Sequence, residues 1–242
     1  HSDKRSDLIT YQSYNEFSRG INSIPSSDAN YTDNYKHIRR TNLLLQNAEA
    51  YAKPEDIKQY IGEAYFFRAY SYFDLLQLYG DVIITKKPLD ITDPEMKVKR
   101  NDRSEVVDLI IDDLNHAVEN LPAFKELTTE EEGRISKEGA QAFLSRVALY
   151  EGTWQKSRNG NQNTQRSANL LDIAAKAART VIDAKYGYTF RLFGTDSETK
   201  ILGDSAQKYM FILENEKSNP AGIKKSSNHE YIFARRHDQV LA

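Results

Sequence analysis

The sequence predicts an all-α fold of stacked helical hairpins, and three observations carry this prediction. The helical pattern of Ala64 to Tyr72 recurs as Ala142 to Tyr150, with Arg68 aligned on Arg146, a period of about 78 residues. Each copy is followed, after a polar or extended interval, by a second amphipathic segment. Capping residues and helix-ending glycines bound these segments. Such units cannot bury their apolar faces alone, so we expect them to stack.

The first two expected helices cover Asp33 to Ala52 and Pro54 to Tyr79. The Asp33 carboxylate can accept hydrogen bonds from the free NH groups of the first turn. The second helix begins with a proline followed by acidic residues, and Gly80 lies just past its end. Its apolar residues form two stripes, and the second stripe includes Phe67 and Tyr70. This pattern predicts neighbours on two sides of the helix.

Three further helices are expected downstream. Asp102 and Glu105 have the spacing of a capping box at the start of a helix from Arg103 to Asn120. Lys137 to Gly152 contains the second copy of the repeated pattern. Ser167 to Ala184 has the apolar periodicity of an amphipathic helix.

The helices divide the chain into three regions of one domain over residues 1–242, which we interpret as part of a larger protein. Residues 1–34 are expected to be an N-terminal loop region, residues 35–186 the repeat helices, and residues 187–242 an irregular segment. Within that segment, Tyr188 to Phe193 and Tyr231 to Phe233 have the composition of short strands or extended packing segments.

Composition excludes several classes of function. The 242 residues carry a net charge of -2, which gives no electrostatic attraction to nucleic acid or to an anionic membrane surface. The chain has no cysteine, so it forms neither disulfides nor thiolate metal sites. No apolar run approaches the roughly 20 residues that span a bilayer.

The chain also lacks the motifs of the common catalytic and cofactor sites, so we expect no enzymatic activity and no cofactor. It has no zinc-protease helix motif, no nucleophile elbow and no glycine-rich phosphate loop. The nearest metal-like feature is His229-Glu230 with His237-Asp238, and its seven-residue gap fits neither a helix face nor a usual loop site. We therefore expect no metal.

The loop ahead of the first helix offers the best candidate ligand contacts. Asn30, Tyr31 and Tyr35 lie close together in the sequence, with Arg39 one turn further into the helix. Flat aromatic faces combined with a few hydrogen-bonding groups suit a sugar ring, which has apolar CH faces and a polar rim. The alternative for Tyr35 is a place on the buried face of the helix.

Arg68 and Arg146 occupy equivalent positions in helices that are apolar on several faces. The simpler interpretation of both is structural: the aliphatic stem packs and the guanidinium group pairs with a carboxylate. Contact with a ligand is the less favoured alternative.

Two segments of the chain resemble the SusD/RagB family of nutrient-binding lipoproteins from the outer membranes of Bacteroidetes. The first segment runs from Tyr35 through Ile38 and Asn42 to Leu45, and the second from Glu63 to Val82. Weaker agreement extends over most of the chain, including Gly133-Arg134 and Glu230 to Ala234.

The resemblance implies tetratricopeptide-like helix pairs with long loops and a few short strands. It also implies a protein without enzymatic activity that binds glycans or other nutrients at the cell surface and delivers them to a SusC-like TonB-dependent transporter. Family members are about twice as long, and the N-terminal cysteine that attaches their lipid anchor is absent here. The repeat pattern alone also fits a helical scaffold for protein interactions without a small ligand.

Overall fold

In the computed structural model, the described part of the chain is predominantly helical. The structure describes residues 20–21, 23–128, 130–131, 133–158, 164–211, 222–223 and 228–233. The α-helices are α2 (Ala29–Glu49), α3 (Lys58–Tyr79), α4 (Arg103–Asn120), α5 (Lys137–Arg158), α6 (Thr164–Ile182) and α7 (Ala206–Phe211). Short 3-10 helices cover Pro54–Ile57, Pro94–Lys97, Phe124–Glu126 and Lys200–Ser205.

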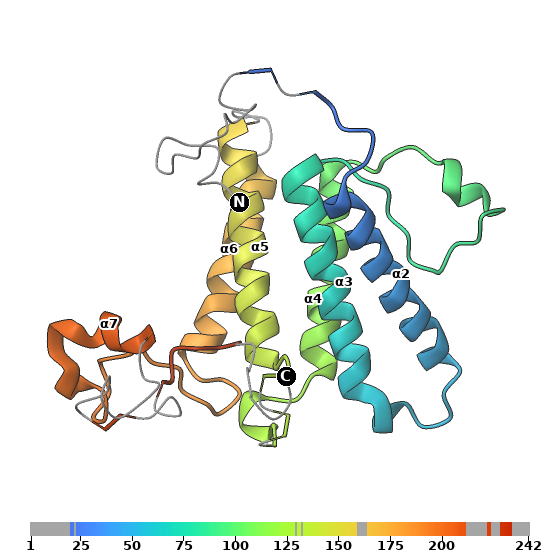
Figure 1. Ribbon diagram of the computed structural model, residues 1–242. Coiled ribbons are helices and arrows are strands. Elements are labelled where there is room, and N and C mark those ends of the chain that lie inside the picture. The colour runs from blue at the N-terminus through green and yellow to red at the C-terminus, as the bar shows by residue number, and fades with distance from the viewer. Residues whose placement is uncertain are drawn as a thin grey trace. The chain divides into compact units, whose positions relative to one another are not determined.

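The predicted hairpins are present. Helix α3 packs on α4, α5 packs on α6, and α4 joins the two hairpins by packing on α5 (Figure 1). The copies of the repeated pattern lie in α3 and α5, the first helix of each hairpin. Contacts divide the chain into residues 1–33 and residues 34–242, and both hairpins belong to the second unit. The prediction of a helical repeat is therefore confirmed.

Most predicted helix boundaries agree with the structure to within a few residues. Helix α4 has the predicted bounds, and Glu105 accepts a hydrogen bond from the Asp102 backbone NH at 3.1 Å, as expected for a capping box. Helix α5 continues six residues past Gly152, to Arg158. Gly152 is needed there for close packing, because a Cβ atom would lie only 3.0 Å from the side chain of Leu171 on α6. Gly152 therefore does not end the helix, and its missing side chain lets α6 pack closely against α5.

The start of the first helix differs from the prediction. Helix α2 begins at Ala29, four residues before Asp33. Asp28 provides the cap, because its carboxylate accepts a hydrogen bond from the Asn30 backbone NH at 2.9 Å. Both aspartates satisfy the sequence rule for a cap. The consequence is that Asn30 and Tyr31 lie in the first turn of a helix rather than in a loop.

The expected strands are not formed in the described residues, where the β-structure is a single bridge between Val82 and Asn101. Tyr188 to Leu192 has no regular secondary structure, and among the described residues the Arg191 NH donates a backbone hydrogen bond to the His229 carbonyl at 3.0 Å, close to Tyr231. The expectation of short strands is therefore wrong for the described residues of these segments, and the alternative of extended packing segments stays a prediction. The rings of Phe124, Tyr188 and Phe190 pack together with centroids 4.5 to 5.2 Å apart.

Aliphatic and aromatic side chains of α3 and α4 fill the core of the first hairpin. Tyr72, Leu75, Leu76, Ile110 and Leu114 are all less than 2% exposed. Trp154 lies where α5 meets α4, with the guanidinium group of Arg103 4.2 Å from its ring centre. In the part of the chain that the structure describes, no helix has both the length and the apolar character needed to cross a membrane.

Candidate functional site

Two of the four predicted ligand contacts lie at the start of α2. The Asn30 side chain is exposed and Tyr31 is half-buried. The first turn is fixed by Asp28, whose backbone carbonyl also accepts hydrogen bonds from the NH and hydroxyl groups of Thr32. The assumption that this backbone is uncommitted to a helix was wrong. Ligand contact by Asn30 and Tyr31 stays a prediction.

The other two predicted contacts hold a neighbouring loop. The Tyr35 hydroxyl donates to the Ile83 carbonyl at 2.8 Å, and the Arg39 guanidinium group donates to the Leu89 carbonyl. Asn42, one turn further along α2, donates to the Thr85 carbonyl at 2.9 Å. These side chains therefore attach residues 83–89 to α2. Their part in ligand binding also stays a prediction.

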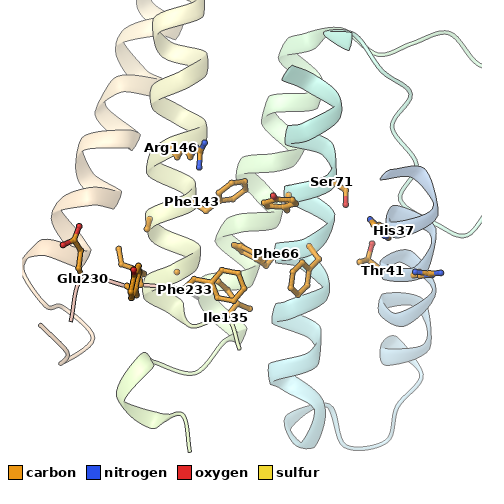
Figure 2. A pocket seen from close by; sticks show the side chains of 16 residues that line it. His37, Thr41, Phe66, Ser71, Ile135, Phe143, Arg146, Glu230 and Phe233 are labelled. Atoms are coloured by element: carbon orange, nitrogen blue, oxygen red, sulfur yellow. The ribbon is translucent and has the colours of Figure 1, made fainter. Parts of the chain in front are cut away.

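A separate cleft of about 890 Å³ lies over the exposed side of α3. Figure 2 shows His37 and Thr41 on α2, Phe66 and Ser71 on α3, and Phe143 and Arg146 on α5 around it. The segment from Glu230 to Phe233 completes the lining. Helix α3 lies between the other two helices, so α2 and α5 form opposite sides of the cleft (Figure 2).

Aromatic rings form the floor of this cleft. Tyr70 and Phe143 are stacked with ring centres 5.4 Å apart and planes inclined by 28°. The ring centre of Phe66 lies 5.5 Å from that of Phe143 and 6.4 Å from that of Phe233. Tyr70 is nevertheless 53% exposed and Phe67 is 43% exposed. The cleft thus has aromatic rings that are supported from one side and open on the other.

Polar groups surround the aromatic floor. Arg40 and His37 come from α2 and Arg146 from α5. Within the part of the chain that the structure describes, neither Arg40 nor Arg146 forms an ion pair. Among the described residues that line the cleft, Glu230 is the only carboxylate, and it accepts a hydrogen bond from the Phe193 NH at 2.9 Å.

The contrast with Arg68 shows that the two repeat copies have diverged. Arg68 is 5% exposed and donates to both oxygens of Asp113, at 2.8 and 2.6 Å, and to the Asn42 side chain at 2.9 Å. Burial raises the pKa of the Asp113 carboxyl above its ordinary value, and the hydrogen bonds from Arg68 offset part of that shift. The structural interpretation of Arg68 is thus supported, whereas the equivalent Arg146 is exposed in the cleft.

The sequence contained a signal for this cleft. Phe67 and Tyr70 form an aromatic stripe on a second face of α3, and we interpreted that stripe as a packing surface. The structure shows that this face is partly open instead. An aromatic stripe has the same sequence pattern whether a neighbouring element covers it or not, so only the tertiary structure distinguishes the two.

The described residues offer no metal centre and no carboxylate pair in the cleft. They contain no group of three histidine, cysteine, aspartate or glutamate side chains placed to hold a metal ion. His237 and Asp238, which belong to the metal-like feature noted above, lie outside the described residues. Among the described lining residues Glu230 is one carboxylate, whereas a glycoside hydrolase uses two.

Comparison with known proteins gives one consistent result. Residues 2–149 match the SusD-like family described as "Starch-binding associating with outer membrane". The SusD-like protein P38 of Formosa agariphila is 33% identical over 133 residues, which are 53% of this chain and 25% of that protein. The chain therefore spans about a quarter of the length of this relative.

Solved structures are similar in fold. A SusD-like protein from Bacteroides fragilis aligns with a TM-score of 0.67 and 24% identity, covering 93% of this chain and 36% of that one. A laminarin-binding SusD-like protein aligns with a TM-score of 0.57 and 25% identity, covering 78% of this chain and 38% of that one. These similarities agree with the helical hairpins described above.

Proposed function

The chain belongs to the SusD-like family, and on that premise we propose that it binds glycans non-enzymatically at the cell surface. The observation that carries the proposal is the cleft over α3, with its open aromatic rings and polar rim. Sugar rings stack their CH faces on aromatic side chains, while fixed polar groups orient their hydroxyls. A relative with the same helical fold is a laminarin-binding protein.

The proposal extends to a partner and a location. We propose that the protein delivers its glycan to a SusC-like TonB-dependent transporter. It would act at the outer membrane, held there by an N-terminal lipid anchor that lies outside this sequence. The family description, which associates starch binding with the outer membrane, supports the location. Co-purification of such a transporter with the tagged protein from Bacteroidetes outer membranes would test the partner.

Glycan binding itself is tested by isothermal titration with a panel of neutral and acidic oligosaccharides. Tyr70→Ala removes an aromatic face that is 53% exposed and is expected to weaken binding roughly two- to twelve-fold, as for the loss of 0.5 to 1.5 kcal/mol of stacking. Tyr51→Ala is the matched control, because Tyr51 is 48% exposed but does not line the cleft.

The outcomes separate the competing functions. A helical scaffold without a small ligand predicts no heat of binding with any glycan in the panel. A glycoside hydrolase predicts new reducing ends after long incubation with a bound glycan. Equal binding by Tyr70→Ala and Tyr51→Ala would remove the cleft as the site.

A further inference from the structure

Some of the described arginines are paired with carboxylates and others are not. Arg68, Arg103, Arg134, Arg166 and Arg179 each lie within ion-pair distance of an aspartate or glutamate. Arg40 and Arg146, which line the cleft, belong to the second group: neither has a carboxylate partner in the part of the chain that the structure describes. A guanidinium group next to an apolar floor interacts more strongly with an anion than one in bulk water.

The two unpaired arginines are placed on opposite sides of the aromatic floor. Arg40 belongs to α2 and Arg146 to α5, and α3 with Phe67 and Tyr70 lies between these helices. Figure 2 shows Arg146 on the α5 side and His37, on the helix that carries Arg40, on the α2 side. A ligand that lies across α3 would therefore meet aromatic rings along its length and a cation on each side.

The sign of the charge in the cleft is opposite to that of the whole chain. The lining contains two arginines and one histidine against a single carboxylate, Glu230, whose side chain already accepts a backbone hydrogen bond. The chain as a whole carries a net charge of -2. Long-range attraction therefore does not favour polyanions, and an anion that binds here is selected by the cleft.

We propose that this cleft binds acidic oligosaccharides, whose carboxylate or sulfate groups are held by Arg40 and Arg146 while their sugar rings stack on Tyr70 and Phe67. The inference rests on the proposed glycan-binding function and names its substrate class. The planar guanidinium fork matches the two oxygens of a carboxylate or sulfate group. A uronic acid or sulfated sugar is the ligand that combines such a group with a CH face for stacking.

The test is isothermal titration with three probes of matched length. These are oligogalacturonides, which carry carboxylates, carrageenan oligosaccharides, which carry sulfates, and neutral laminarin oligosaccharides. We expect at least one acidic probe to bind roughly tenfold or more tightly than laminarin oligosaccharides. The difference in affinity between the acidic and the neutral probe should become smaller as the salt concentration is raised. The two acidic probes distinguish carboxylate from sulfate as the recognised group.

Substitutions of two arginines test whether the preference for acidic probes arises in the cleft. Arg146→Gln is expected to reduce the affinity for the acidic probe roughly tenfold or more and to change laminarin binding less than about twofold. Arg146→Lys should be intermediate, because it keeps the charge but loses the fork. Arg179→Gln is the matched control, since it removes the same charge from an exposed site on α6 and should leave all affinities unchanged.

The results that overturn the inference differ from those that overturn the proposed function. Neutral probes that bind as tightly as acidic ones, or Arg146→Gln and Arg179→Gln with equal effects, would overturn the inference and leave glycan binding intact. Absence of binding by all three probes would overturn the proposed function as well. Binding of a polyglutamate peptide but no glycan would show that the cleft accepts an acidic polypeptide instead.

Discussion

Arg68→Met is expected to destabilise the protein strongly, because it leaves a buried carboxylate without its counter-charge. Asp113 is 0% exposed and receives two hydrogen bonds from Arg68, at 2.8 and 2.6 Å. Removing one member of a buried ion pair costs about 3–5 kcal/mol. Methionine keeps most of the volume of the aliphatic stem, so the loss reports the charge rather than a cavity.

The corresponding shift in melting temperature is large enough to measure without ambiguity. A domain of this size loses roughly 2–4 °C for each kcal/mol, so the melting temperature should fall by roughly 6 to 20 °C. Thermal and urea unfolding followed by circular dichroism measure the change. Glycan affinity of the folded fraction should stay within about twofold, because Arg68 does not line the cleft.

Two further variants test whether the loss of stability in Arg68→Met comes from the unpaired buried charge. Arg134→Met breaks a bidentate pair with Glu63 whose side chains are 35% and 17% exposed, and it should cost about 1 kcal/mol or less. The double variant Arg68→Met with Asp113→Leu should recover part of the lost stability, since no unpaired charge remains buried. A loss for Arg68→Met no larger than that for Arg134→Met would refute the electrostatic account. A large loss of glycan affinity at unchanged stability would instead make Arg68 a ligand contact.

Three further predictions concern α2 and α3. Gly62→Ala should lower the free energy of unfolding by about 1–3 kcal/mol in urea titrations despite its better helix propensity, because the added Cβ would lie 2.9 Å from the Leu121 backbone nitrogen; unchanged stability would contradict this packing. Tyr35→Phe should cost about 0.5–1.5 kcal/mol of stability through the lost bond to Ile83, and a loss of glycan affinity without a loss of stability would make Tyr35 a ligand contact. Tyr31 does not line the cleft, so its variants test a second contact region at the start of α2: Tyr31→Ala should weaken glycan binding roughly two- to twelve-fold with little change in melting temperature, and Tyr31→Phe should retain most of the affinity. An unaltered titration for Tyr31→Ala would leave the cleft over α3 as the site.

The sequence was sufficient to predict the features that depend on neighbouring residues. The spacing of Asp102 and Glu105 predicted the start of α4, and the structure shows the hydrogen bond that this spacing allows. The recurrence around Arg68 and Arg146 predicted two hairpins. Periodicity and capping act within one or two turns of a helix, so the local sequence contains the whole interaction.

Where two nearby residues could both begin or end a helix, the sequence did not predict which of them does so. Asp28 and Asp33 can both cap a helix, and the fold uses Asp28. Gly152 has the pattern of a helix end, yet α5 continues past it and the glycine faces Leu171 of α6. The packing of Gly152 against Leu171 joins two helices, so the local sequence does not contain it.

The helical architecture, the family resemblance and the structural interpretation of Arg68 could all be predicted from the order of the residues. The pairing of Arg68 with Asp113, 45 residues away, could not, nor could the position of its repeat equivalent Arg146, which lies in a cleft without a carboxylate partner among the described residues. The physical reason is that a residue type and its helical position fix which groups are present, whereas the partner of a charge and the cover of an aromatic face are set by the packing of separate helices.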